Sequence, residues 1–317
     1  MLFSIIIANY NKADNIQALL SSIFDSYPYD DFELFFMDDA STDSSVNEAN
    51  NFPARIYSSE KHIGPAALRN LAAKDAKGEF LLFVDSDVIL PPASLENFRN
   101  LCLTQEFAAV LGLEVLPPVI DNWIGNFRTL QVQDNWGEYR TKQAAVEAWG
   151  TTFGAIRRDL FLKIGGFNES YKGADVEDHE LAAKIEGGQT ILFSPNMTYR
   201  HSYSGAFELM IKQFLRASQM MKIQRKALVK HSHYGLRFRV SHLLVAAAFA
   251  GSIACLFDLR WIYFVTTALV SRAVLNSYLL SQAIKVKGFV FAVYCFLMSL
   301  IMSLSIFAGA VYGKFRK

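Results

Sequence analysis

Two carboxylates separated by one residue, Asp85 and Asp87, come directly after the apolar run FLLFV. Carboxylates spaced in this way at the end of a strand can share a divalent cation and ribose hydroxyls. Mg²⁺ or Mn²⁺ accepts such oxygen ligands and completes its shell with substrate phosphates. The cation would then offset the charge that develops on a departing diphosphate. Solvated turns also contain this D-x-D pattern, so the position of the pair in the fold decides what it means.

A second acidic group ends another apolar run, in the order Asp38, Asp39, Ser41 and Asp43. Acidic and hydroxyl groups there can accept hydrogen bonds from a nucleobase N–H or from a ribose hydroxyl. The alternative is a helix cap, because Ser and Asp are favoured at the N-cap. Both interpretations can hold together, with Asp39 at the nucleotide and Asp43 at the cap.

Glu177 and Asp178 open a predicted helix, and His201 follows the last predicted strand. One of the two carboxylates can act as a general base if it points into a cleft. The alternative, acidic residues that complement a helix N-terminus, is favoured when the pair is considered alone. The imidazole of His201 can complete a metal shell or contact a phosphate, although a lone histidine is more often structural.

Apolar periodicity indicates the elements that must position these groups. Residues 3–8, 32–37, 55–58 and 79–84 have the pattern of buried strands, and residues 12–26 and 64–74 that of helices. Further along, 108–115, 151–156 and 190–193 are predicted strands, and 157–164 and 178–185 predicted helices. Strands that alternate with helices indicate an α/β fold with a mostly parallel sheet, whose ligands bind at the carboxyl ends of the strands. The polar residues at such ends are Asn9, Asp38, Asp39, Asp85 and Asp87.

Composition limits the class of protein. The 317 residues suit one catalytic domain with an appendage. With 31 basic and 30 acidic side chains, the chain has no strong basic field that would favour nucleic acid as a partner. Its 3 cysteines have no spacing typical of a disulfide framework or a zinc site, which fits a reducing compartment. The N-terminus has the pattern of a buried strand rather than of a signal peptide.

From Phe207 onward an amphipathic helix is predicted, with basic side chains between the apolar ones. This pattern is typical of a helix at a membrane surface, and packing on a soluble domain is the alternative. The basic residues that follow suit anionic headgroups: Arg225, Lys226, Lys230, Arg237 and Arg239. Together they define an interface segment, residues 206–239, after a catalytic domain of residues 1–205.

Three apolar segments occupy residues 240–317, at about 240–257, 261–284 and 288–313. A membrane span needs about 20 apolar residues, so we expect two or three transmembrane helices and a multi-pass protein. The first segment either spans or is re-entrant, and a soluble helical core is the alternative to all three. Arg272 is the one charged residue of the second segment, and we expect it to face a neighbouring helix or a lipid phosphate.

Taken in order, five stretches resemble the inverting glycosyltransferases of family 2, which have the GT-A fold. They are SIIIANYN, MDDASTDSS, GPAALRNLAAKDAKGEFLLFVDSDV, FGAIRRDLFLKIGGFNE and VEDHELAAKI, and they span residues 4–185. The resemblance is to membrane-anchored bacterial members, and the opening stretch is similar to a member that uses a pyrimidine nucleotide.

The resemblance implies roles for individual residues. The nucleotide would be bound by Ala8, Asn9, Asp39, Arg69, Asp85 and Ser86. A Mg²⁺ or Mn²⁺ cofactor would be held by Asp87 and Asp85, with His201 as a third ligand. Asp178 would be the catalytic base, with Glu177 as its neighbour.

We therefore predict transfer of one sugar from a nucleoside diphosphate sugar to an acceptor at the membrane. Asp39 can accept from the ring N3–H of uracil or thymine, which favours a UDP- or dTDP-sugar. The acceptor would be a polyprenyl phosphate, a glycolipid or a cell-envelope glycan, and membrane lipids would be partners. The catalytic domain would be cytoplasmic, because nucleotide sugars are cytosolic and the interface segment is basic.

Two alternatives remain from the sequence. Polymerising members carry Q-x-x-R-W before their membrane helices, whereas this chain has Gln213, Arg216 and then Ala217. This difference favours a single transfer over a processive polysaccharide synthase. The second alternative is a nucleotide-binding membrane protein without catalysis, against which the intact D-x-D and Glu-Asp pairs argue. A nucleotidyltransferase is disfavoured because no Gly-rich phosphate loop follows the first strand.

Overall fold

The computed structural model describes the chain except for residues 172, 174–175, 186–188, 204, 226–235 and 316–317. Its contacts divide the chain into two compact units. The first unit comprises Met1–Val115 and Glu138–Ser202, and the second comprises Leu116–Gly137 and Tyr203–Lys317. The second unit therefore contains an internal segment of the chain as well as its C-terminal part.

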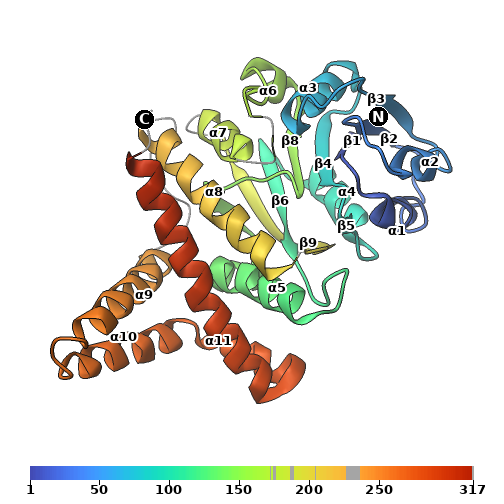
Figure 1. Ribbon diagram of the computed structural model, residues 1–317. Helices are drawn as coiled ribbons and strands as arrows, with labels where there is room; N and C mark the ends of the chain where they lie inside the picture. The colour runs from blue at the N-terminus through green and yellow to red at the C-terminus, as the bar shows by residue number, and fades with distance from the viewer. Residues whose placement is uncertain (172, 174–175, 186–188, 204, 226–235, 316–317) are drawn as a thin grey trace. The chain divides into compact units, whose positions relative to one another are not determined.

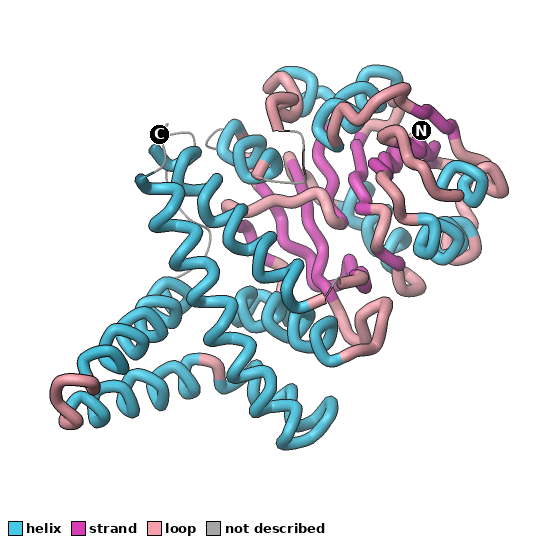
Figure 2. Tube along the Cα trace, in the orientation of Figure 1, coloured by secondary structure: helices cyan, strands magenta, loops and turns pink. Residues whose placement is uncertain are grey.

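The first unit is built on one mixed sheet whose strands are drawn in magenta in Figure 2. Its order is β3-β2-β1-β4-β8-β6-β9-β5, and β7 also pairs with β9. The parallel half contains β1 (Phe3–Asn9), β2 (Phe32–Asp38), β3 (Arg55–Ser58) and β4 (Phe80–Asp85). The other half contains β5 (Val88–Ile89), β6 (Ala109–Glu114), β7 (Ala144–Val146), β8 (Phe153–Arg157) and β9 (Ile191–His201). β8 runs antiparallel to both of its neighbours, whereas β6 and β9 are parallel, so the sheet is mostly parallel as predicted.

Helices cover both faces of this sheet, which is why its central strands are apolar on both sides. The helices of the first unit are α1 (Ala13–Phe24), α2 (Ser45–Ala49), α3 (Pro65–Asp75), α4 (Ser94–Thr104), α6 (Arg158–Lys163) and α7 (Glu177–Lys184). A 3₁₀ helix occupies Gly137–Thr141. Side chains of α1 and α4 share one core with Phe3, Ile5 and Ile7 of β1. On β4, the Phe83 ring contacts the rings of Trp149, Phe161 and Phe167.

The second unit is helical over its described residues. It consists of α5 (Trp123–Trp136), α8 (Ala206–Arg225), α9 (Leu236–Ala254), α10 (Trp261–Leu275) and α11 (Ser277–Phe315). Asn122 caps α5, because its Oδ1 accepts from the Gly125 N–H at 2.7 Å. Ion pairs join α5 and its preceding loop to this unit, from Asp134 to Arg237 at 2.7 Å and from Asp121 to Lys287 at 2.9 Å.

The helices α8 and α11 lie side by side (Figure 1), and small residues of α11 allow their close approach. The Ser305 hydroxyl donates to the Met210 carbonyl at 2.7 Å. A Cβ on Gly309 would lie 2.2 Å from the Phe214 carbonyl oxygen, and one on Gly313 would lie 2.3 Å from that of Ser218. The contact residues are spaced by four on both helices, so they lie along one face of each. The amphipathic segment that begins at Phe207 thus forms a helix, as expected. Its placement at a membrane surface stays a prediction, and Lys226 and Lys230 lie outside the described residues.

The expectation of a multi-pass protein is not supported. Within the described chain, only α11 is long and apolar enough to cross a membrane by length and composition. The second apolar segment is not one helix, because α10 ends at Leu275 and Asn276 leaves helical geometry. At 15 residues and about 1.5 Å per residue, α10 is shorter than the hydrocarbon core of about 30 Å. The Arg272 guanidinium donates to the Ser299 carbonyl at 3.5 Å and to the Ser303 hydroxyl at 3.2 Å, which agrees with its expected place against a neighbouring helix.

The packing of α8 on α11 predicts the effect of a single methyl group. We expect Gly309→Ala to lower the free energy of unfolding by about 1–3 kcal/mol, because the added Cβ forces the two backbones apart. Thermal unfolding of the full chain, followed by circular dichroism, measures this loss. Gly205→Ala is the control, since a Cβ there meets nothing within 4 Å. Equal melting temperatures for the two variants would contradict the close approach.

Candidate active site

Three parallel strands end in polar residues at the same edge of the sheet. Asn9 of β1 is opposite Asp38 of β2, and Ala8 is opposite Asp85 of β4. The Asn9 amide donates to Asp38 Oδ1 at 2.9 Å and to the Ser41 hydroxyl at 3.1 Å. The loops that follow β1 and β2 are therefore held together, and the edge expected from the sequence is present.

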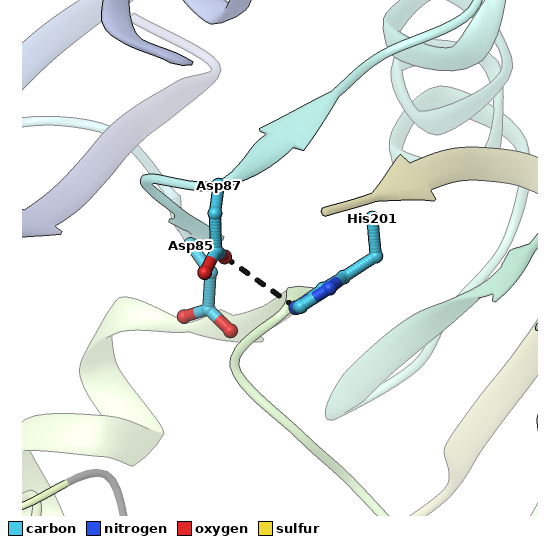
Figure 3. Close-up of side chains that lie close together, drawn as sticks. All are labelled: Asp85, Asp87 and His201. Atoms are coloured by element: carbon cyan, nitrogen blue, oxygen red, sulfur yellow. Dashed lines mark ion pairs between the residues drawn. The ribbon is translucent and has the colours of Figure 1, made fainter. Parts of the chain in front are cut away.

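Asp85, Asp87 and His201 gather at this edge (Figure 3). One potential ligand atom from each residue lies within 4.8 Å of the other two. Asp85 ends β4, whereas Asp87 lies in the turn that leads directly into β5. His201 ends β9, where it is opposite Val88 in the antiparallel β5–β9 pair. The Ser202 N–H donates to the Asp87 carbonyl at 2.8 Å, and His201 Nε2 lies 3.4 Å from Asp87 Oδ1.

Each of the two aspartates is ion-paired with a basic side chain. The Arg69 guanidinium donates to Asp85 Oδ1 at 2.8 Å, and Lys12 Nζ lies 3.0 Å from Asp87 Oδ2. Arg69 is 4% exposed, whereas the Lys12 side chain is 38% exposed. The positive charge beside Asp85 is thus buried, and the one beside Asp87 is in contact with solvent.

Arg69 also reaches the start of α7. Its second guanidinium nitrogen donates to Glu177 Oε1 at 3.0 Å, and its face lies 5.8 Å from the centre of the Phe167 ring. The next residue, Asn70, accepts from the Phe167 N–H at 2.9 Å and donates to its carbonyl at 2.9 Å. Two successive residues of α3 therefore hold the segment that leads into α7.

Asp178 follows Glu177 but has a different environment. It is partly exposed, and its Oδ1 accepts from the His179 N–H at 2.8 Å. A Cβ placed on Gly150 would lie 3.4 Å from Asp178 Oδ2, so the absence of a side chain at Gly150 leaves room beside that oxygen. Gly150 belongs to the turn before β8, in which the Thr152 carbonyl accepts from the Asp85 N–H at 3.2 Å.

Asp39 is enclosed by the segment that opens α3. Its carboxylate accepts from the Ile63 N–H at 2.7 Å and from the Gly64 N–H at 2.9 Å, and His62 Nδ1 lies 2.9 Å away. The residue is 2% exposed. Beside it the half-exposed rings of Tyr10 and His62 are in contact, with centroids 4.7 Å apart.

The Asp43 carboxylate accepts hydrogen bonds at the starts of both α1 and α2, although the N-cap positions of these helices are held by Lys12 and Ser44. Asp43 Oδ2 accepts from the Ala13 N–H at 2.9 Å, and Oδ1 accepts from the Ser45 N–H at 3.0 Å and from the Ser45 hydroxyl. Burial alone would raise the pKa of the Asp43 carboxyl. The hydrogen bonds from Ser45 and Ala13 outweigh that effect and hold the pKa below its ordinary value.

The sequence predicts that Asp85, Asp87 and His201 share one site, but it does not predict that Lys12, Asn70 and Gly150 lie close to the site residues. A signal existed for Lys12, which follows the carboxyl end of the first strand by three residues. For Gly150 no local pattern indicates that a carboxylate 28 residues later lies beside it.

The Asp85–Asp87–His201 group fits a divalent cation. Carboxylate oxygens are ligands of Mg²⁺ and Mn²⁺, and an imidazole nitrogen is accepted more readily by Mn²⁺ than by the harder Mg²⁺. Three protein ligands on one side leave other coordination positions for phosphate oxygens.

Comparisons with known proteins give the family and the fold of the chain. Residues 4–158 match the family described as Glycosyl transferase family 2. An uncharacterized glycosyltransferase of Haemophilus influenzae is 27% identical over 187 residues, which are 58% of this chain and 62% of the relative. The UDP-Glc:alpha-D-GlcNAc-diphosphoundecaprenol beta-1,3-glucosyltransferase WfgD of Escherichia coli is 33% identical over 114 residues, 35% of this chain and 45% of the relative. The chain thus matches less than two thirds of the length of either relative.

A solved structure resembles nearly the whole chain. It is a mannosyltransferase from Pyrobaculum calidifontis in complex with GDP-Man and Mn²⁺, with a TM-score of 0.59 and 19% identity. The match covers 99% of this chain and 87% of that one. Fold and site together define an α/β enzyme with a GT-A-like domain followed by C-terminal helices. The chain belongs to glycosyltransferase family 2.

The candidate metal group predicts a specific loss of cation binding. We expect Asp87→Asn to weaken Mn²⁺ binding at least tenfold, or about 1.4 kcal/mol, because it removes a charged ligand. Calorimetric titration of the purified chain with Mn²⁺ measures this change. Asp159→Asn, at a carboxylate that is 74% exposed on the same unit, is the matched control. Unchanged affinity in Asp87→Asn would place the cation elsewhere.

Proposed function

We propose that this enzyme transfers one sugar from a nucleoside diphosphate sugar to a membrane-associated acceptor, with inversion at the anomeric carbon. The observation that carries this proposal is the double contact of Arg69. It holds Asp85 of the metal group and Glu177, the first residue of α7, at one place. This contact supports the proposal because such a transfer requires a cation site and a carboxylate base close together, and Arg69 joins the candidate metal group to the helix of the proposed base.

Asp85, Asp87 and His201 would hold the cation, with Mn²⁺ favoured over Mg²⁺ because of the imidazole. A divalent cation there supplies positive charge that stabilises a departing diphosphate. The presence of Mn²⁺ with the Pyrobaculum calidifontis mannosyltransferase supports this choice.

For the nucleotide we propose Ala8, Asn9, Asp39, Asp85 and Ser86, which lie at or next to the carboxyl ends of β1, β2 and β4. The deep burial of Asp39 and its bonds to two backbone N–H groups also give it a structural role, since they hold the start of α3. For Arg69 the contacts favour positioning of Asp85 and Glu177, and its contact with the nucleotide stays a prediction.

We propose Asp178 as the general base. Glu177 is 3% exposed and its carboxylate is ion-paired with Arg69, so its position suits support of the site rather than proton transfer. Asp178 is partly exposed and has room beside it at Gly150. It would remove the proton of an acceptor hydroxyl while that oxygen attacks the anomeric carbon. The bond to the diphosphate breaks on the opposite face, which inverts the configuration. A phosphate acceptor is already anionic and would depend less on this base.

We propose that the acceptor lies at the membrane and that α11 is the anchor. The Escherichia coli relative is named for an acceptor sugar on diphosphoundecaprenol, and α11 has the length and composition of a span. A polyprenyl-linked acceptor would suit both observations, and a glycolipid or cell-envelope glycan would share its location. The catalytic unit would be cytoplasmic, where nucleotide sugars are available.

Incubation with nucleotide sugars tests the activity and the donor together. The chain is mixed with Mn²⁺, a membrane lipid extract and UDP-, dTDP- or GDP-sugars in turn, and the lipids are analysed by mass spectrometry. We expect one added sugar residue from a UDP- or dTDP-sugar, because Asp39 can accept from the N3–H of uracil or thymine. Product from GDP-mannose alone would contradict the choice of base. A ladder of added sugars would favour a processive synthase, and no turnover of any donor would contradict the activity.

Substitution of the two adjacent acids separates their roles. With a hydroxyl acceptor, Asp178→Asn should lower kcat by about 10²–10⁴-fold, the usual contribution of a positioned general base. Its affinity for the nucleotide and its melting temperature should stay close to those of the wild type. Glu177→Gln should instead lower the melting temperature, because it leaves the Arg69 charge partly uncompensated in a buried site. A folded Glu177→Gln enzyme with the larger loss of kcat would move the base to Glu177.

A further inference from the structure

The two aspartates of the metal group are neutralised in different ways. Asp85 is paired with Arg69, whose guanidinium is also fixed by Glu177 and lies over the Phe167 ring. Asp87 is paired with Lys12, and the Lys12–Asp87 contact is the one ion pair of Lys12 that the described residues show. Arg69 therefore cannot leave Asp85 without breaking a second buried ion pair, whereas no such constraint holds the Lys12 ammonium.

The backbone of Lys12 is held by hydrogen bonds, whereas its ammonium is held by the ion pair with Asp87. Lys12 precedes the first turn of α1 with non-helical dihedral angles, and its N–H donates to the Ser45 hydroxyl at 3.1 Å. Asn11 adopts a φ of 51°, and its side-chain oxygen accepts from the Thr42 N–H at 2.8 Å. A stem of four methylene groups thus extends from a fixed point at the carboxyl edge, and its ammonium can move by rotation about the stem.

A cation at the metal group would change the balance of charge around Lys12. The same Asp87 carboxylate that contacts Lys12 is one of the three ligand groups. A doubly charged ion bound there would repel an ammonium that stays within about 4 Å of the same carboxylate, and the partial burial of the site limits screening by water. The ion pair between Lys12 and Asp87 therefore disfavours binding of a divalent cation, and a bound cation would in turn disfavour that ion pair.

We propose that Lys12 is an exchangeable cation. It neutralises Asp87 before the donor binds, and it transfers to an oxygen of the donor diphosphate when a divalent cation occupies the metal group. The ammonium carries three donors and is a common ligand of phosphate, so the exchange replaces one anionic partner with another. The proposal rests on the proposed function and adds to it a diphosphate contact from the loop after β1.

The exchange predicts two effects of opposite sign in Lys12→Met, which keeps the length of the stem but removes its charge. Calorimetric titration with Mn²⁺ alone should show affinity at least threefold higher than in the wild type, because no ammonium has to leave Asp87. Titration with UDP and with GDP at saturating Mn²⁺ should show affinity at least tenfold lower for whichever nucleotide the wild type binds more tightly. Lys142→Met is the control, since it removes an exposed lysine that pairs with Glu138 on the same unit. It should change neither affinity.

The outcomes separate this inference from the function on which it rests. A damaged fold would weaken both ligands together, so only the opposite changes support the exchange. Mn²⁺ affinity that is unchanged or lower in Lys12→Met overturns the inference and leaves the metal site intact. Higher Mn²⁺ affinity with unchanged nucleotide affinity overturns the contact with diphosphate. Absence of Mn²⁺ binding by the wild type would overturn the proposed metal site and the inference together.

Discussion

The buried guanidinium of Arg69 is the contact on which the geometry of the site depends. It joins α3 to the end of β4 through Asp85 and to the start of α7 through Glu177. Removing one partner of a buried ion pair typically costs about 3–5 kcal/mol, because a charge is left without compensation. Asn70 adds backbone hydrogen bonds to the same segment. Since Asp178 follows Glu177 directly, the position of the proposed base is set by the same residue that orients a metal-group carboxylate.

The half of the site on parallel strands could be predicted from the sequence. Buried parallel strands have long apolar runs, so the ends at Asn9, Asp38 and Asp85 follow from where those runs stop. The half of the site that depends on pairing between distant strands could not be predicted from the sequence. β5 has two residues and no pattern of its own, yet it brings Asp87 beside His201 through its pairing with β9. The predicted strand of residues 190–193 ends before Pro195, whereas β9 continues to His201 because its register with β6 shifts between Gly112 and Leu113.

The C-terminal part shows a second limit of periodicity. Apolar composition predicts two or three spans, but composition does not reveal where a helix stops. Asn276 ends α10, and the backbone of Lys287 and Gly288 leaves helical geometry within α11, with a φ of 81° at Gly288. Local periodicity assigns no element to the segment Leu116–Gly137, although α5 packs in the helical unit. Its place there comes from long-range contacts, such as Asp134 with Arg237, that no local pattern indicates.

Charge balance connects these parts of the catalytic unit. Two carboxylates spaced by one residue repel each other unless cations lie beside them. Here the two cations come from different elements, the buried Arg69 of α3 and the more exposed Lys12 before α1. Two fixed basic side chains would resist the binding of a divalent ion, and without any basic side chain the two carboxylates would repel each other. One fixed and one exchangeable cation keep the group assembled before binding and still leave Asp87 available as a ligand. The diphosphate that arrives with the donor then supplies the negative charge that the displaced ammonium requires.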